Sequence, residues 1–292
     1  MPELPEVETV RLGLEKLLVG HTILVETHDT DKGFPNSSSD VEQFLVGAEV
    51  IAVRRRAKVL LIDLNTSYTL VIHLKMTGQL VYRGKESFGA GHPNESLIGA
   101  LPDRSTRVTF ELDRGAKLFF NDQRKFGWVR LLPTIEVPNI DFMKKVGPEP
   151  LEDDFTPKIF IERIRRRANT SIKAALLDQT VLAGIGNIYA DESLWGAKIH
   201  PATHVKDVSD AELKKLFTEI QYVLRLAIEK GGSTDKNYVN AEGKKGSYID
   251  FARVFRREGL PCPRHSDTLI VKSKVAGRGT HTCPRCQTIV KY

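Results

Sequence analysis

The chain has 292 residues, with 43 Lys and Arg against 37 Asp and Glu, a net charge of +6 and 41% hydrophobic residues. No stretch approaches the roughly 18 consecutive apolar residues of a membrane span, and the acidic start PELPEVE differs from the basic head of a signal peptide. We therefore exclude an integral membrane protein and expect a cytoplasmic one. The basic excess favours a polyanionic partner without demonstrating it.

The first half of the chain combines one helix with many strands. Apolar residues recur at helical spacing just behind Pro5 and predict a helix that ends near Gly20: Val7, Val10, Leu14 and Leu17. Runs rich in β-branched and aromatic residues follow, including AEVIAVRRRAKVLLIDL and YTLVIHLKMTGQLVY. They predict a β-sandwich or barrel. The polar, turn-rich stretch 84–106 predicts a long loop that is mobile.

The second half of the chain predicts helices. Its composition changes in GPEPLEDDFTP, residues 147–157, which we interpret as a linker. Three short helices are expected in PKIFIERIRRR, SIKAALLD and IYADESLWG. The strongest helical pattern begins at Ser209, which forms a capping box with Glu212, and ends at Gly231 and Gly232. The Gly-rich stretch 231–250 predicts an exposed loop.

The last segment carries a metal-ligand pattern. CPRH and CPRC place two residue pairs, each with the spacing of a zinc ribbon, 17 residues apart: Cys262, His265, Cys283 and Cys286. A closed set of four ligands leaves no position for water, so one structural Zn²⁺ is expected. His281 is a rival for the fourth ligand. Between the pairs, KSKVAGRGTHT predicts a basic hairpin tip, suited to phosphate contact or simply solvated.

Three stretches together carry a resemblance to a known family: PELPEVETV at the N-terminus, GIGNIYADESLW at 184–195 and VAGRGTHTCPRCQ at 275–287. The chain resembles bacterial formamidopyrimidine-DNA glycosylases, which excise oxidised purines such as 8-oxoguanine. The resemblance spans essentially the whole chain. It implies an α+β multidomain fold: an N-terminal β-sandwich domain at 1–146, a helix-two-turn-helix domain at 147–252 and a zinc-finger hairpin at 253–292.

The resemblance also implies roles for residues of the first domain. Pro2, once Met1 is removed, is similar to the nucleophile, Glu3 to the acid/base group that acts on the sugar, and Glu6 to its supporting carboxylate. Lys58 matches a lysine that contacts phosphates beside the lesion. The trio that fills the duplex space left by the everted nucleotide corresponds to Met76, Arg124 and Phe126.

In the second half, the resemblance implies that Asn187 and Arg278 grip the kinked DNA backbone. The segment 232–248 corresponds to the one that closes over the everted base. His265 stands where the family usually has a second cysteine, and a neutral imidazole is also a good zinc ligand. Phe255 and Arg256 stand where a Tyr-Gly pair is common. The implied partner is double-stranded DNA with oxidised bases, bound by a monomer.

The expected chemistry depends on a terminal amine. An unperturbed α-amino group has a pKa near 7.7–8.0, so it is far more available as a neutral nucleophile than lysine, near 10.4. A terminal proline is a secondary amine, and its adduct with the sugar is an iminium that can drive β- and then δ-elimination of the flanking phosphates.

Two other functions are also consistent with this sequence. An enzyme of the endonuclease VIII type uses the same proline chemistry on oxidised pyrimidines, although the PELPEVET start and the wedge trio favour the purine enzyme. A non-catalytic protein that binds damaged DNA would keep the fold and lose the reaction. In that case, the three glutamates near the N-terminus merely populate the first turn of a helix.

Overall fold

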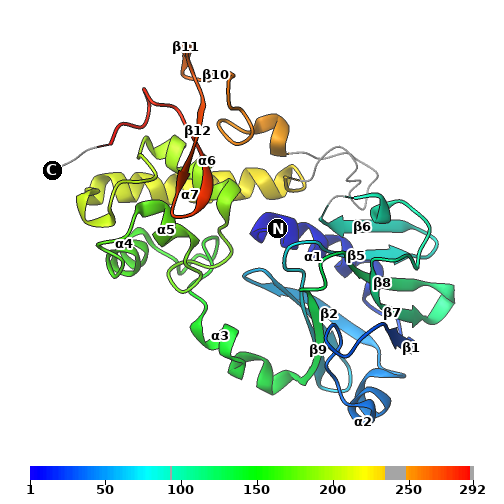
Figure 1. Ribbon diagram of the computed structural model, residues 1–292. Coiled ribbons are helices and arrows are strands. Elements are labelled where there is room, and N and C mark those ends of the chain that lie inside the picture. The colour runs from blue at the N-terminus through cyan, green and yellow to red at the C-terminus, as the bar shows by residue number, and fades with distance from the viewer. Residues whose placement is uncertain (93, 234–247, 290–292) are drawn as a thin grey trace. The chain divides into compact units, whose positions relative to one another are not determined.

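The computed structural model describes residues 1–92, 94–233 and 248–289. The chain divides into two compact units (Figure 1). The first, the sandwich unit, comprises Met1–Lys144 and Lys230–Ser247, and the second, the helical unit, comprises Lys145–Glu229 and Tyr248–Tyr292. In the described ranges, no helix is long and apolar enough to cross a bilayer.

The sandwich unit contains two antiparallel sheets and the N-terminal helix α1 (Leu4–Leu18). The five-stranded sheet consists, in spatial order, of β1 (Ile23–His28), β7 (Thr106–Leu112), β8 (Lys117–Asp122), β5 (Gly78–Arg83) and β6 (Ser87–Gly91). The four-stranded sheet consists of β2 (Val50–Arg56), β3 (Val59–Leu64), β4 (Tyr68–His73) and β9 (Trp128–Pro133). The predicted sandwich is confirmed.

Side-chain alternation along the strands builds two cores on opposite faces of the four-stranded sheet. In β3, Leu60 and Ile62 point into the main core between the sheets, together with Val10 of α1. Leu61 points to the other face, into a smaller core with Val137. The smaller core is covered by two short helices, η4 (Thr134–Asn139) and α3 (Asp141–Lys145). Burial on both faces explains why β3 reads as a continuous apolar run.

The expectation of a long mobile loop at 84–106 is wrong. Residues Ser87–Gly91 form β6, which pairs with β5, and Glu95–Leu97 form the short helix η2. Phe88 of β6 is buried in the main core. The polar composition that suggested a loop instead supplies local hydrogen bonds, since Ser96 and Ser105 both donate to Asp103. Small polar side chains satisfied by one another are easily mistaken for a solvated loop.

Short helices complete the sandwich unit: α2 (Ser38–Asp40), η1 (Val41–Leu45) and η3 (Asp113–Gly115). The helical unit contains α4 (Pro157–Arg165), α5 (Ile172–Leu177), α6 (Asn187–Ala197), η5 (Val205–Asp207), α7 (Asp210–Glu229) and η6 (Tyr248–Phe251). The capping box before α7 is confirmed, because Ser209 N donates to Glu212 Oε2 at 2.8 Å and Glu212 N donates to Ser209 Oγ at 3.3 Å. One apolar core joins these helices.

Two small antiparallel hairpins follow η6 in the helical unit: β10 (Pro261–Cys262) with β11 (His265–Leu269), and β12 (Val271–Val275) with β13 (Arg278–Thr282). The second hairpin turns at Ala276 and Gly277, which both have positive φ, as a two-residue turn between twisted strands requires. The hairpins share a small core with Trp195 at the end of α6. The zinc-finger segment and the helices therefore belong to one compact unit.

Candidate functional site

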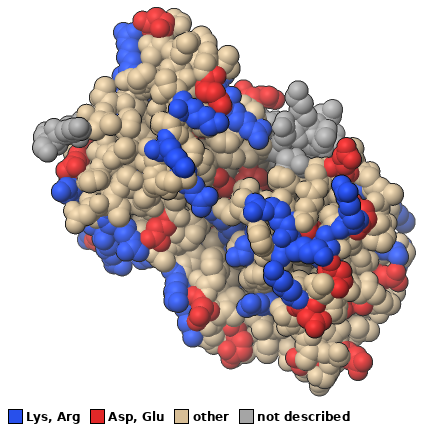
Figure 2. Space-filling model, viewed as in Figure 1, with Lys and Arg blue, Asp and Glu red and all other residues tan. Residues whose placement is uncertain are grey.

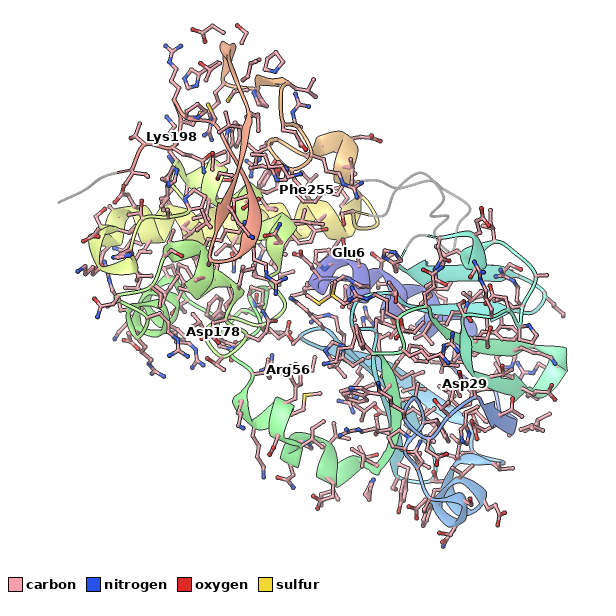
Figure 3. All side chains as sticks on the ribbon, viewed as in Figure 1. Glu6, Asp29, Arg56, Asp178, Lys198 and Phe255 are labelled. Carbon is pink, nitrogen blue, oxygen red and sulfur yellow. The ribbon has the colours of Figure 1, made fainter. Side chains whose placement is uncertain are left out.

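The N-terminus of the chain lies in a buried acidic setting at the start of α1. Pro2, Glu3 and Glu6 are buried, and Glu6 is labelled in Figure 3 at the beginning of the helix. Glu6 Oε2 accepts the amide of Glu3 at 2.8 Å, and Glu6 Oε1 accepts the amide of Ser233 at 2.7 Å. Carboxylates are favoured here because the helix N-terminus carries partial positive charge. Glu6 thus ties the beginning of segment 232–248 to the first turn of α1.

The terminal amine has a perturbed pKa. In this structure the amine belongs to Met1, and its pKa is lowered from the usual 8.0, first by burial and then by the charges of Lys58 and Arg124. Glu3 and Glu6 oppose that shift. Removal of Met1 would place the terminal amine on Pro2, which is buried and adjoins the same charged groups. The surroundings favour a neutral amine, the form that can attack carbon.

Glu8 has a structural role, unlike the other two glutamates. Its carboxylate binds Arg11 Nε and Arg55 Nε, each at 2.8 Å. Arg55 also donates to the carbonyl of Ala57, so this ion pair fastens α1 to the turn between β2 and β3. Of the three acidic residues, Glu3 and Glu6 face the amine, and Glu8 supports the scaffold.

Lys58 projects from that same two-residue turn. Ala57 has φ +53°, and Arg56 pairs with Val59 on the two sides of the turn. Lys58 is only 6% exposed. Its charge also acts on His73, whose pKa is lowered to about 3 by burial together with Lys75 and Lys58. The structure therefore brings Lys58 into the electrostatic surroundings of the terminal amine.

The candidate wedge residues lie on two loops that one carboxylate joins. Met76 is half buried, whereas Arg124 and Phe126 are exposed, with the guanidinium 4.9 Å from the Phe126 ring centroid. Asp122 is fully buried and accepts the amides of Arg124, Phe126 and Gly127 at 2.7–3.2 Å. It also accepts the hydroxyl of Thr77, which adjoins Met76.

Sequence reasoning missed Asp122. The signal that could have found it is a charged residue at the end of the apolar strand in KLFFND, directly before the exposed QRKF. A buried carboxylate that accepts several amides fixes the loop backbone, and so fixes where neighbouring side chains point. Asp122 therefore fixes the backbone of the loop that carries Arg124 and Phe126.

In the helical unit, Asn187 and the strand that begins with Arg278 come together. Asn187 is the first residue of α6, and its Nδ2 donates to the carbonyl of Gly279 at 3.0 Å. The Lys173 ammonium, fully buried, donates to Asp191 at 2.7 Å, to the Gly279 carbonyl at 3.0 Å and to Thr280 Oγ1 at 2.8 Å. Sequence reasoning missed this buried ion pair, which joins three elements.

The Arg278 guanidinium has no hydrogen-bond or ion-pair partner within the described part of the chain, and the residue is exposed. Its backbone, however, is fixed by the hairpin and by the bonds to Gly279. The Arg278 side chain is therefore attached to a fixed backbone and is available to bind an anionic group of a partner. Asn187 and Arg278 are thus brought to one place, as expected for two residues that contact the same backbone.

The four predicted metal ligands form one cluster. The donor atoms of Cys262, His265, Cys283 and Cys286 all lie within 4.8 Å of one another. Cys262 Sγ and Cys286 Sγ are 3.7 Å apart, close to the separation of about 3.7–3.8 Å that two thiolates have on a tetrahedral zinc ion. Two amides point at the sulfurs, Arg264 N at Cys262 and Cys286 N at Cys283, each at 3.4 Å. The donor set and its geometry fit a metal ion.

His281, the rival ligand, lies outside that cluster. Its Nδ1 is 3.4 Å from Asp191 Oδ2 and its Nε2 is 3.3 Å from Glu258 Oε2. Its ring packs edge-on against Phe255. The alternative between the two histidines is therefore decided in favour of His265.

The sequence has two runs of three arginines, Arg54–Arg56 and Arg165–Arg167, and several of these side chains are engaged within the protein. Arg54 makes a two-point ion pair with Asp63 at 2.5 and 2.8 Å, and Arg55 binds Glu8. In the helical unit, Arg165 binds Asp210 and Arg167 binds Asp178, each at 2.7 Å. Figure 2 shows Lys and Arg side chains gathered in patches on the viewed face.

Comparison with known proteins agrees with this arrangement. Residues 1–129 match the formamidopyrimidine-DNA glycosylase N-terminal domain, and residues 146–238 match the H2TH domain of the same family. A formamidopyrimidine-DNA glycosylase of Streptococcus pyogenes is 43% identical over 291 residues, which cover 98% of each chain. One from Pelotomaculum thermopropionicum is 40% identical over 290 residues, covering 99% of this chain and all of its own.

Solved structures show the same likeness. Lactococcus lactis Fpg in complex with DNA containing an abasic site superposes with a TM-score of 0.86 at 35% identity, covering 98% of this chain and 99% of its own. A variant of that protein bound to DNA containing Fapy-dG gives a TM-score of 0.86 at 34% identity, covering 98% and 100%. A β-sandwich with a buried N-terminus, an H2TH module and a Cys/His hairpin define a class of DNA repair glycosylases.

Within that class, the chain belongs to the formamidopyrimidine-DNA glycosylase family. The resemblance stated from its motifs is confirmed, as is the α+β fold that the resemblance implied.

Proposed function

We propose that this chain excises oxidised purines, such as 8-oxoguanine and formamidopyrimidines, from double-stranded DNA with Pro2 as the nucleophile, and then cleaves the strand. By its family, the chain is a DNA glycosylase of base excision repair. The residues and the lesion class are the proposal. The observation that carries it is the setting of the terminal amine, which adjoins buried Pro2 and whose pKa is lowered by partial burial among Glu3, Glu6, Lys58 and Arg124.

The proposed reaction begins with eversion of the damaged nucleotide. Eversion costs a few kcal/mol, less for a damaged base. Met76 and Phe126 occupy the vacated stack, and the Arg124 guanidinium donates to the orphaned partner base. Asp122 supports this step, because its bonds to the amides of residues 124, 126 and 127 fix the backbone of the loop that carries Arg124 and Phe126.

The amine of Pro2 then attacks the anomeric carbon and displaces the base. Glu3 protonates the sugar oxygen as the ring opens, which leaves an iminium on the proline nitrogen. That cation accepts electrons during β- and δ-elimination of both flanking phosphates. Lys58 binds phosphate beside the lesion, and Glu6 holds the helix start and Ser233, at the beginning of segment 232–248. Most of that segment, 234–247, lies outside the described residues.

Asn187 and Arg278 are proposed to grip the kinked backbone from the helical unit. Phosphate contacts of this kind position the duplex without reading its sequence. They also make the affinity fall as salt rises. The metal bound by the Cys/His cluster is proposed to be one structural Zn²⁺, which would fix the hairpins that carry Arg278.

Borohydride trapping on an oligonucleotide with 8-oxoguanine opposite cytosine tests the reaction. A covalent adduct that is lost in Pro2→Gly supports the glycosylase-lyase. Trapping only on damaged pyrimidines would identify an enzyme of the endonuclease VIII type, and specific binding without any adduct a binding protein. The relatives' family favours the purine enzyme.

Metal analysis tests the cofactor. The purified chain should hold one zinc, and Cys286→Ser should lose it, because structural zinc sites in small domains bind with about 10–16 kcal/mol. His281→Gln is the matched control and should keep the metal. Equal zinc content in Cys286→Ser and the unaltered chain would reject the four-ligand site.

A further inference from the structure

Two loops cross between the two sheets of the sandwich unit. Residues 74–77, the Met76 loop, connect β4 of the four-stranded sheet to β5 of the five-stranded sheet, and residues 123–127, the Arg124 loop, return from β8 to β9. β4 and β9 pair where the loops meet the four-stranded sheet, and β5 and β8 pair where they meet the five-stranded sheet. The two loops therefore begin and end beside each other.

The Met76 loop is a single closed turn. The Gly78 amide donates to the Leu74 carbonyl at 2.8 Å, and Lys75, within the turn, has φ +51°. Position 78 requires glycine, because a Cβ atom there would collide with the Leu74 carbonyl oxygen. The backbone that carries Met76 and Thr77 is thus fixed at both ends of the turn.

The hydroxyl of Thr77 joins the Met76 loop to the Arg124 loop. Thr77 is buried, at 8% exposed, and its Oγ1 donates to Asp122 Oδ1. The same oxygen accepts the amide of Arg124 at 3.0 Å, and Asp122 Oδ1 lies 3.2 Å from that amide. A carboxylate only accepts and an amide only donates, whereas a hydroxyl does both. Thr77 can therefore connect the two groups at once.

The Asp122 carboxylate extends this connection to the rest of the Arg124 loop. Its Oδ2 accepts the amides of Phe126 at 2.8 Å and Gly127 at 2.7 Å. Asp122 is fully buried, and a buried carboxylate is costly unless donors surround it. Within the described ranges, Thr77 is the donor that the Met76 loop supplies to it. Loss of that hydroxyl would leave the carboxylate held by the Arg124 loop.

Each candidate wedge residue lies next to a member of this buried network. Met76 directly precedes Thr77, the Arg124 amide donates to the Thr77 hydroxyl, and the Phe126 amide donates to Asp122. The side chains of Arg124 and Phe126 are exposed, and that of Met76 is half buried. Because their backbones share one set of hydrogen bonds, a shift of one loop displaces the other.

We propose that Thr77 is a positioning residue that makes the two loops enter the duplex as one unit. This inference rests on the proposed wedge roles of Met76, Arg124 and Phe126. With the Thr77 hydroxyl in place, insertion of one side chain carries the others to the vacated stack. Without it, each loop inserts separately, and insertion of the whole wedge is slower.

Stopped-flow fluorescence on a non-reactive duplex tests this role. The duplex carries a tetrahydrofuran abasic analogue opposite 2-aminopurine, whose emission responds to stacking, and saturating enzyme makes the rate report insertion rather than binding. Thr77→Val keeps the shape of the side chain and removes the hydroxyl. It should slow insertion about 10-fold, within the usual contribution of a hydrogen bond to a charged group. Thr77→Ser keeps the hydroxyl and should restore most of the rate.

Thr69→Val is the matched control. Thr69 is also buried, near the opposite end of β4, and its hydroxyl donates to the Asp63 carboxylate at 2.8 Å. Both valine variants lose the same kind of bond, so their losses of stability in thermal unfolding should be similar. Only Thr77→Val should slow insertion, and equal slowing in the two variants would reject the role of Thr77.

A double-mutant cycle measures the coupling between the loops. In the unaltered chain, the loss of insertion rate in Met76→Ala combined with Phe126→Ala should be several-fold smaller than the product of the two single losses, as for residues that act as a unit. In the Thr77→Val background, the two losses should multiply. A simple product in both backgrounds would reject the coupling, and a general loss of stability would not produce the difference.

The outcomes separate this inference from the proposed function. If truncation of Met76, Arg124 or Phe126 leaves the fluorescence change as it is, the wedge roles fail and that of Thr77 fails with them. If truncation slows insertion and Thr77→Val does not, only the role of Thr77 is rejected. The tetrahydrofuran analogue cannot form an iminium, so a failure of Pro2 as the nucleophile would leave this test unaffected.

Discussion

The two ends of the chain use buried charge in opposite ways. At the N-terminus, burial lowers the pKa of the terminal amine, and two acids and two cations act on it together. At the C-terminal hairpin, the Lys173 ammonium is fully buried and meets Asp191, Gly279 and Thr280 with all three of its donors. The arrangement at the N-terminus leaves the amine reactive, and the arrangement around Lys173 joins three elements rigidly. Burial alone therefore does not distinguish a catalytic group from a structural one, whereas the completeness of its partners does.

The largest expected effect is on the reactive end. Glu3→Gln keeps the size of the side chain and removes the acid that is proposed to act on the sugar oxygen. We expect base excision to fall by about 10²–10⁴-fold, the usual contribution of a general acid or base. The measurement is single-turnover excision of 8-oxoguanine. Glu8→Gln, which alters only the Arg11 and Arg55 pairs, should keep most of the activity, and equal losses in the two variants would contradict the distinction between the glutamates.

A substitution in the buried Lys173–Asp191 ion pair should change the stability of the protein rather than the rate of its reaction. Lys173→Met leaves the Asp191 carboxylate buried without its cation, which costs about 3–5 kcal/mol of unfolding free energy. Thermal and denaturant unfolding measure this loss. Adding Asp191→Asn to Lys173→Met should recover part of it, because the orphaned charge is removed. No recovery in the double variant would mean that the pair does not act through its charge.

The pH dependence of the trapping rate should further distinguish the reactive N-terminus from the structural ion pair of Lys173. The amine attacks only when neutral, so the trapping rate rises with pH through the pKa of the amine. Lys58 lowers that pKa. Lys58→Met should therefore move the rising limb to higher pH and slow trapping several-fold near neutrality. Lys75→Met, on a neighbouring loop, is the control, and an unshifted limb in Lys58→Met would remove Lys58 from the surroundings of the amine.

The smallest expected effect concerns Arg256, which stands where the resemblance implies a glycine. Arg256 adopts φ +56°, the left-handed conformation that glycine accepts without strain. Its guanidinium lies 5.7 Å from the Phe255 ring centroid, a contact that offsets part of the strain. Arg256→Gly should raise the free energy of unfolding by up to about 1 kcal/mol. Measured destabilisation would show that the side-chain contacts outweigh the backbone strain.

The sequence predicted the features that depend on local pattern. The helix behind Pro5, the capping box at Ser209 and the Cys-x-x-His and Cys-x-x-Cys pairs each follow from spacing along the chain, and all three are confirmed. The spacing favoured His265 as the fourth ligand, but it could not exclude His281, whose position depends on where β13 lies relative to Asp191.

The missed residues share one physical property, which is that their partners are distant in sequence. Asp122 bonds to Thr77, 45 residues earlier, and Lys173 to Gly279, 106 residues later. The stretch 84–106 reads as a loop because its polar groups satisfy one another, and only strand pairing shows it to be part of the sheet.

The proposed function requires that the imino group of Pro2, freed by removal of Met1, captures the sugar. The most direct measurement is the mass of the N-terminal peptide from enzyme trapped on DNA containing 8-oxoguanine. We expect a peptide that lacks Met1 and carries the reduced sugar on Pro2. An adduct on a lysine such as Lys58, or active enzyme in which every chain retains Met1, would contradict it.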